Sequence, residues 1–337
     1  MRSWRACLAA LLWWALACAA QAGEATHHVQ GHVFGTTVEV SIYGGEAARA
    51  EQLGAQVLRE FDRLHHKFHA WEASPLTELN EHIARGEPYE SDAEMVELLK
   101  GAAALAAQAG NTFNPAIGHL IRLWGFQSSD IVPQSPPPSE IRRWVQANPR
   151  MSDLVFEGTR ISSRNKAVML DLGGYAKGYA LDRAAAILRA GHVKAALVNV
   201  GGNILAIGQP GERAWRVGIQ DPRGAGLVAS VALHDNEAIG TSGDYQRFFI
   251  KDGKRHGHVI DPRTGASVAE VAAVTIIASG GADPGTRSDG YSKPLFIAGP
   301  AEWQAMAAHL GVKEAMLIDA RHKVSITPAL QARIAAQ

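Results

Sequence analysis

Cysteine is nearly absent from this 337-residue chain. The two cysteines, Cys7 and Cys18, both lie before residue 20. If the chain is cut after Ala22, no cysteine remains, which excludes a cysteine nucleophile, a thiolate zinc site and an iron–sulfur cluster. Export to an oxidising compartment without disulfides requires a core that is stable by itself, and 47% hydrophobic residues in a chain of this length can provide one.

A net charge is also missing, because 33 Lys and Arg residues balance 33 Asp and Glu residues. With a pI near 7.3 the composition gives no indication of a nucleic-acid partner. The sequence lacks the HExxH motif of zinc peptidases, the P-loop, the dinucleotide-binding GxGxxG pattern and the GxSxG motif of serine hydrolases. The chemistry must therefore be inferred from local clusters of polar residues.

One long hydrophobic run is present, in residues 6–20 at the N-terminus. Two arginines precede it, and the small residues of Ala20-Gln21-Ala22 follow it. The run is short for a membrane-spanning helix, which needs about 20 residues, so the pattern predicts a signal peptide over residues 1–22. The Leu-Ala-Cys sequence that ends at Cys18 resembles the end of a lipoprotein signal, so a lipid anchor is a second interpretation. We favour soluble export.

Hydrophobic periodicity indicates strands mixed with long helices. Alternating apolar residues predict a hairpin over residues 28–44 with its turn near Gly35. We expect an α+β fold with helices packed on mostly antiparallel sheets. The proline-rich stretch 131–139 predicts a loop, which is a candidate hinge between two lobes. Helices are expected at residues 46–69, 92–110, 139–147, 175–189 and 301–310. Strands are expected at residues 154–156, 160–162, 167–172, 195–200, 204–207, 216–219, 228–233, 274–278 and 315–318.

Three stretches in the second half combine glycines with groups that bind phosphate or move protons. They are DLGGYAKGYALD (171–182), NVGGN (199–203) and the stretch from TSGDY (241–245) to HVIDPRTG (258–265). Glycine lets a backbone approach a ligand closely, and a lysine or a helix N-terminus can hold phosphate. A histidine near carboxylates and hydroxyls suits proton transfer. Each stretch alone is compatible with an ordinary turn, but together they favour an enzyme that acts on a large phosphorylated ligand.

These stretches and several others resemble, in order along the chain, the ApbE-type FAD:protein FMN transferases. The resemblance extends from Gly35 to Gly299. Several motifs in the same order are far more specific than any one of them. The further matching motifs are FGTT (34–37), Trp71, Ser74 with Leu79-Asn80, TFNP (112–115) with Gly118, LWGF (123–126) and Asp289.

The resemblance implies a periplasmic enzyme, formed by residues 23–337 as a single catalytic unit with two lobes. Such an enzyme binds FAD and Mg²⁺, transfers the FMN moiety of FAD to a threonine hydroxyl of a partner protein, and releases AMP. The partner would be a flavin-acceptor subunit of a membrane-associated redox system. Two alternatives stay open: a periplasmic FAD-binding protein without activity, and a pyrophosphatase that hydrolyses FAD to FMN and AMP.

The resemblance also implies roles for individual residues. His258 would be the base that deprotonates the acceptor threonine. Gly174 would offer its carbonyl and Asp289 its carboxylate to the metal. The FAD contacts would come from Phe34, Trp71, Thr112, Phe113, Asn114, Asp171, Lys177 and Ile260.

Lys293 departs from this pattern, because the family usually has a threonine four residues after the metal-binding aspartate as a further metal ligand. A charged lysine has no lone pair to give to a metal. Beside Asp289 it would repel a divalent cation, pair with the carboxylate and neutralise the diphosphate directly. We therefore expect Lys293 to weaken or replace Mg²⁺ binding. The alternative is that Lys293 turns to solvent and that Ser292 or water fills the coordination site.

Overall fold

The computed structural model describes residues 25–335 with the exception of residue 129. The predicted signal peptide and Cys18 lie outside the described residues, so both interpretations of the N-terminus stay predictions. Within residues 25–128 and 130–335, no helix combines the length and the apolar character needed to span a membrane.

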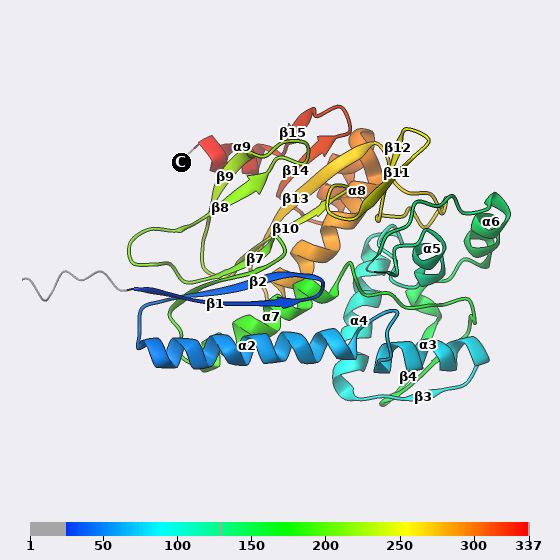
Figure 1. Cartoon of the computed structure of the whole chain (residues 1–337), viewed down its shortest axis with the longest axis horizontal. Helices are drawn as coiled ribbons and strands as arrows, with labels where there is room; N and C mark the ends of the chain where they lie inside the picture. Colours follow the sequence, from blue (N-terminus) through cyan, green and yellow to red (C-terminus); the bar gives the residue numbers. More distant parts are fainter. Residues whose placement is uncertain (1–24, 129, 336–337) are drawn as a thin grey trace, which may run out of the picture.

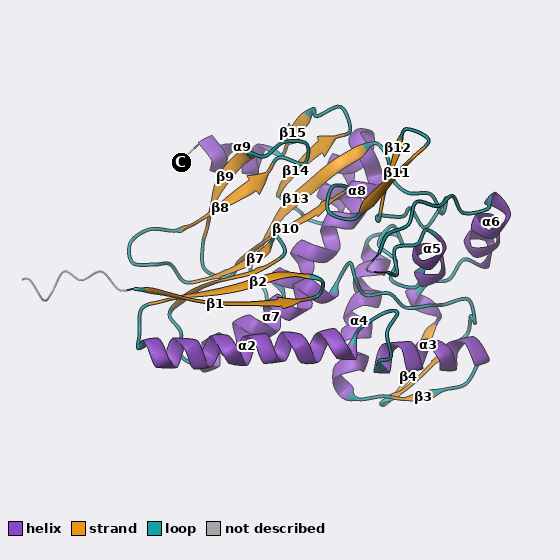
Figure 2. Cartoon of the chain, viewed as in Figure 1, coloured by secondary structure: helices purple, strands orange, loops and turns teal. Residues whose placement is uncertain are grey.

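The main element is an eight-stranded sheet in which all neighbouring strands are antiparallel (Figure 2). In sheet order its strands are β1 (Thr26–Val33), β2 (Thr36–Tyr43), β6 (Ala195–Val200), β7 (Asn203–Ile207), β10 (Glu237–Gly243), β13 (Val271–Ser279), β14 (Glu314–Asp319) and β15 (Val324–Ile326). The smaller sheets are β3 (Tyr89–Glu90) with β5 (Arg160–Ser163) and β4 (Leu154–Glu157), β8 (Trp215–Gln220) with β9 (Leu227–Leu233), and β11 (Phe248–Lys251) with β12 (Lys254–Gly257).

Different elements cover the two faces of the main sheet. Helices α2 (Ala47–Lys67), α7 (Ala176–Ala190) and α8 (Pro284–His309) cover one face, and the β8–β9 pair and α9 (Pro328–Ala335) lie on the other (Figure 1). Strand β14 shows why, since Ala315 and Leu317 pack towards α8 while Met316 and Ile318 face the other way. This arrangement confirms the predicted α+β fold with antiparallel sheets.

A second, mainly helical region lies beyond the C-terminal end of α2 (Figure 1). The proline-rich loop joins two of its helices, and its action as a hinge stays a prediction. The region holds the three-stranded sheet, a 3₁₀ turn (Met151–Asp153) and the helices α3 (Pro75–Arg85), α4 (Ala93–Gln108), α5 (Gly118–Leu123) and α6 (Pro138–Ala147).

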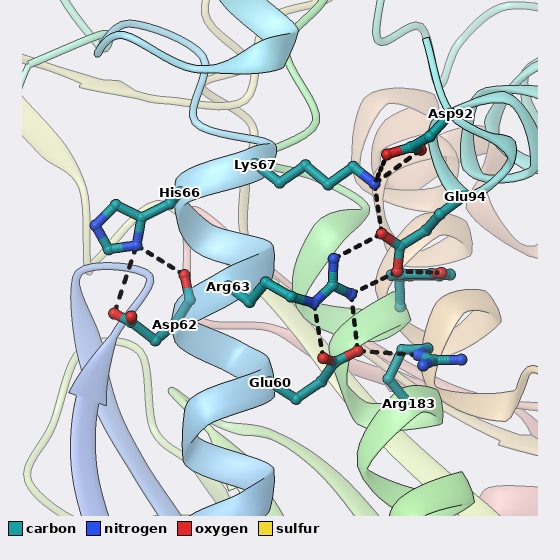
Figure 3. Close-up of polar contacts among 9 residues, drawn as sticks. Glu60, Asp62, Arg63, His66, Lys67, Asp92, Glu94 and Arg183 are labelled. Atoms are coloured by element: carbon teal, nitrogen blue, oxygen red, sulfur yellow. Dashed lines mark hydrogen bonds and ion pairs between the residues drawn. The ribbon is translucent and has the colours of Figure 1, made fainter. Parts of the chain in front are cut away.

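A network of ion pairs joins the end of α2 to α4 and α7 (Figure 3). Arg63 of α2 contacts Glu94 at 2.6 Å and Glu60 at 2.8 Å. Lys67 lies 2.6 Å from Glu94, and Arg183 of α7 lies 3.1 Å from Glu60. We call this network, together with Asp92, the α2 clamp. It fixes the middle of α7 against the rest of the helical layer.

Helices α7 and α8 cross at two glycines close to their N-termini. A methyl group added at Gly178 would lie 2.4 Å from the carbonyl oxygen of Gly285 and 2.7 Å from Cβ of Asp289. Asp182 of α7 also accepts the backbone N–H groups of Gly285 and Thr286, both at 2.8 Å, and so caps the start of α8. These contacts place Asp289 directly at the first turn of α7.

One local prediction was wrong and another was incomplete. Residues 167–172 form no strand, because their backbone groups pair with a loop at Ala116 and Gly118 and with the side-chain amide of Asn80, which bonds both N–H and C=O of Leu170. The helix expected at residues 301–310 is the second half of α8, which starts at Pro284 and is kinked at Gly299. Asp289 therefore lies inside a helix.

Candidate active site

The base of the β11–β12 hairpin brings His258 and Arg247 together. The backbone N–H and the Nδ1 atom of His258 both lie 3.2 Å from the carbonyl oxygen of Arg247. Since a carbonyl oxygen can only accept, Nδ1 carries the proton of the neutral ring and Nε2 keeps a lone pair. Burial, followed by the charges of Arg247 and Lys177, lowers the pKa of His258 to about 3. The ring is thus neutral at physiological pH and able to accept a proton at Nε2.

Asp289 faces the first turn of α7. Its side chain is 1% exposed, and Oδ2 accepts the N–H of Gly178 at 2.9 Å. Oδ1 pairs with Lys293, whose Nζ also donates to the carbonyl oxygen of Asp289 at 2.8 Å. Burial alone raises the pKa of Asp289, but Lys293 and Lys177 outweigh it and hold that pKa below its ordinary value. The expected pairing of Lys293 with Asp289 is therefore present.

The three residues expected at the metal are brought together, but their arrangement does not fit Mg²⁺. A methyl group added at Gly174 would lie 3.1 Å from Cε of Lys293, so the lysine side chain passes over Gly174 on its way to Asp289. Both carboxylate oxygens of Asp289 already have partners. The described part of the chain contains no group of three or more His, Cys, Asp or Glu side chains that could hold a metal. Mg²⁺ prefers six oxygen ligands, and here an ammonium group stands in the way.

An aromatic line leads to this site from the β1–β2 turn. Phe34 contacts His65 edge-on, with ring centroids 5.5 Å apart, and His65 contacts His69 at 4.9 Å. His69 contacts Trp71 at 4.7 Å, and the Arg247 guanidinium lies over the Trp71 ring at 5.5 Å. Because Trp71 is 36% exposed, its ring can stack on a flat ligand at the edge of the site.

Asp171 and Lys177 also lie at this site. The two carboxylate oxygens of Asp171 accept the N–H of Gly173 and the amide of Gln127, each at 2.9 Å. Lys177 is half-buried in the first turn of α7, and its charge acts on His258, Asp289 and Lys293. Its ammonium has no hydrogen-bond partner among the residues that the structure describes.

Four predicted FAD-contacting residues have local partners instead. The Thr112 hydroxyl donates to the carbonyl of Ala109 at 2.6 Å, and the Asn114 amide donates to Pro149 at 2.8 Å. Phe113 is buried with its ring 6.0 Å from that of Tyr175, and Ile260 is buried in a separate apolar cluster. Their contacts with FAD stay predictions.

The sequence-based list of site residues omitted Arg247 and Gln127. A signal for each was present, because Arg247 lies two residues after TSGDY and Gln127 directly follows LWGF. By contrast, the carboxylate of TSGDY itself is structural, since Asp244 pairs with Arg223 through two contacts of 2.6 and 2.7 Å.

The fold and the site define an α+β protein in which cationic side chains and the N-terminus of a helix lie close to a neutral histidine. Sequence comparison agrees with this class. Residues 34–317 match the ApbE family, and the chain belongs to that family.

Individual relatives extend this result. A protein of Rhodobacter capsulatus named FAD:protein FMN transferase is 37% identical over 311 residues, which cover 90% of this chain and 58% of that protein. This chain thus spans less than two thirds of the length of that relative. The crystal structure of the ApbE protein from Thermotoga maritima has a TM-score of 0.84 at 27% identity and covers 92% of this chain and 99% of its own. The apo form of the Pseudomonas stutzeri flavinyl transferase ApbE has a TM-score of 0.80 at 27% identity, with 93% and 98% covered.

Proposed function

We propose that this chain is an FAD:protein FMN transferase, which moves the FMN moiety of FAD to a threonine hydroxyl of an acceptor protein and releases AMP. The observation that carries the proposal is the neutral His258 with a free Nε2, beside Lys177 and Lys293. The relatives that bear this name support it, as does the family to which the chain belongs.

His258 would act as the general base. Its Nε2 takes the proton of the threonine hydroxyl, which is a poor nucleophile until that proton leaves. The hydroxyl oxygen then bonds to the phosphorus of the FMN half, and the bond from that phosphorus to the bridging oxygen breaks. AMP leaves with the bridging oxygen and its electron pair. Lys177 and Lys293 would offset the negative charge of the diphosphate during this step.

The low pKa of His258 suggests an order of events. Apart from burial, the cations Arg247, Lys177 and Lys293 keep the proton off the ring. A bound diphosphate would counter these charges and raise the pKa of His258 towards its ordinary range, where a general base is most effective. FAD would therefore bind first and convert His258 into a competent base before the acceptor threonine reacts.

The metal requirement follows from Lys293. The Lys293 ammonium already pairs with the carboxylate of Asp289. We therefore propose that Mg²⁺ binding is weakened or replaced in this chain, and that FAD binding persists without Mg²⁺. The lysine charge supplies part of the electrostatic stabilisation that a divalent cation would give to the diphosphate.

The location and the partner are inferred from the N-terminal sequence and the family resemblance. The signal over residues 1–22 supports export to the periplasm, in soluble form rather than lipid-anchored at Cys18. There the acceptor would be a flavin-carrying subunit of a membrane-associated redox system.

One incubation tests this proposal against its alternatives. The mature protein, with FAD and a domain that carries the acceptor threonine, should produce AMP and an acceptor that stays fluorescent after denaturation. AMP formed at the same rate without the acceptor would indicate a pyrophosphatase. Bound FAD with neither product would indicate a flavin-binding protein without activity.

A further inference from the structure

Arg247 is a half-buried arginine that lacks a carboxylate partner. Its Nη2 donates to the carbonyl oxygens of Phe126 at 2.6 Å and Ser128 at 3.0 Å, and the described residues offer it no salt bridge. Burial lowers the pKa of Arg247, and Asp171 offsets this effect in part. Other partly buried arginines, such as Arg223, are paired with a carboxylate. An unpaired buried charge is costly, so its retention calls for an anion that the chain itself does not supply.

Asp171, whose charge acts on Arg247, already has other hydrogen-bond partners. Both oxygens of Asp171 already accept hydrogen bonds from neutral donors, the Gly173 N–H and the Gln127 amide. The Nε and Nη1 donors of Arg247 have no hydrogen-bond partner within residues 25–128 and 130–335. Among the described residues these two donors are therefore free to meet a ligand. The guanidinium lies 5.5 Å from the centre of the Trp71 ring, and its charge acts on His258.

We propose that Arg247 binds the phosphate group of the FMN half of FAD through its charge and one of these free donors. A guanidinium keeps its charge when partly buried and is more weakly hydrated than a lysine ammonium, so it suits a phosphate at such a site. The inference rests on the proposed function, in which Trp71 contacts the flavin and His258 activates the threonine. Arg247 would join the two by holding the phosphorus that is attacked, within reach of the base and one ribityl chain away from the ring.

A ligand series tests this assignment through binding alone. Riboflavin, FMN and FAD would be titrated by calorimetry, in EDTA, into the mature protein and into Arg247→Met. The variant should bind FMN and FAD about 10- to 100-fold more weakly, the effect of losing hydrogen bonds to a charged group, and riboflavin within about twofold of the unmodified protein. Arg247→Lys should recover part of the loss, because it keeps the charge but not the planar geometry of the guanidinium donors.

Arg255→Met is the matched control. Arg255 belongs to the same hairpin, but its guanidinium lies over the Phe248 ring at 3.7 Å, and its replacement should leave all three affinities unchanged. Thermal unfolding of each variant separates lost binding from lost folding.

Equal weakening for riboflavin would place Arg247 at the flavin ring and overturn the inference, as would unchanged FAD affinity. These outcomes are separate from the proposed function. A protein that binds FAD but modifies no acceptor contradicts the function, whereas normal transfer by Arg247→Met contradicts only the role of Arg247.

Discussion

The α2 clamp and the active site are two groups of charged side chains that differ in how many of their cations have a carboxylate partner. In the clamp, Arg63, Lys67 and Arg183 each contact a carboxylate at 3.1 Å or less, and three cations face three anions (Figure 3). In the site, Lys293 contacts a carboxylate, whereas Lys177 and Arg247 do not within the described residues. The clamp is complete without a ligand.

The difference separates structural charge from functional charge. Paired surface charges hold helices in register at little net gain in free energy. Partly buried cations that lack counterions lower the stability of the fold. They are found where a substrate anion supplies the missing charge. Substitutions in the two groups should therefore separate stability from FAD binding.

The largest effect is expected for His258→Ala, which removes the proton acceptor but none of the cations. Transfer to the acceptor should fall by about 10²–10⁴-fold, the usual contribution of a general base, while FAD affinity stays nearly unchanged. Acceptor fluorescence gives the rate and calorimetry gives the affinity. A normal transfer rate would show that His258 is structural and that the base lies elsewhere.

Gly178→Ala should damage the site while leaving the clamp intact. The added methyl group would meet the Gly285 carbonyl oxygen at 2.4 Å, so α7 and α8 must separate near Asp289. We expect a loss of about 1–3 kcal/mol in the free energy of unfolding, together with weaker FAD binding. Gly226→Ala is the control, because its methyl group would meet nothing within 4 Å. Equal stability of both variants in urea would argue against the tight crossing.

Lys293→Thr should make the site depend on a metal. In the unmodified protein, EDTA should leave FAD affinity unchanged, because the ammonium occupies Asp289. In the variant, FAD affinity should fall about tenfold in EDTA and recover with Mg²⁺. Lys313→Thr, at an exposed position, is the control, and its FAD affinity should neither fall in EDTA nor respond to Mg²⁺. Equally tight Mg²⁺ binding by the unmodified protein and the variant would contradict the expectation.

The smallest effect is expected in the clamp. The Arg63 hydrogen bond, with that of Lys67, lowers the pKa of Glu94 from 4.5 to about 2. Because the folded-state pKa is the lower one, the stabilisation is present above pH 4.5 and is lost as the pH falls from 4.5 towards 2. We expect about 1 kcal/mol after allowance for solvent screening.

Glu94→Gln should be less stable than the unmodified protein by that amount at pH 7, and the difference should shrink at pH 3, as measured by urea unfolding. FAD affinity should not change. Weaker FAD binding in this variant would show that the clamp and the site are coupled.

Much of the fold follows from local signals. The alternation in residues 28–44 predicted the β1–β2 hairpin. The cap of α4 could be narrowed only to Ser91 or Asp92, and the structure shows Asp92, with its side chain 2.9 Å from the Met95 N–H. Contacts between residues far apart in the sequence, which here replace regular local structure, could not be predicted. The side chain of Asn80 takes the place of a neighbouring strand for Leu170, which lies 90 residues later in the chain. The first half of α8 was not recognised as a helix, because it contains glycines that its packing requires. At Gly290, for example, a methyl group would lie 2.4 Å from Leu105.

The candidate site divides in the same way. His258, Asp289 and Lys177 stand in motifs and could be proposed one by one, and the fold then brings them together. The importance of Arg247 depends on two carbonyl groups that lie 121 and 119 residues earlier in the chain. Arginines are common on surfaces, so the position of Arg247 two residues after TSGDY was a signal that could be interpreted only once its partners were known.

The carbonyl oxygen of Arg247 receives both the backbone N–H and the Nδ1 of His258. A backbone group therefore determines which nitrogen of His258 carries the proton. Substitutions at position 247 that preserve the hairpin should leave this tautomer unchanged. The direction in which Nε2 points is therefore set by the length of the hairpin rather than by a side chain. Insertions at the exposed tip, Asp252-Gly253, should be tolerated during divergence, whereas one residue added at the base would misdirect the ring.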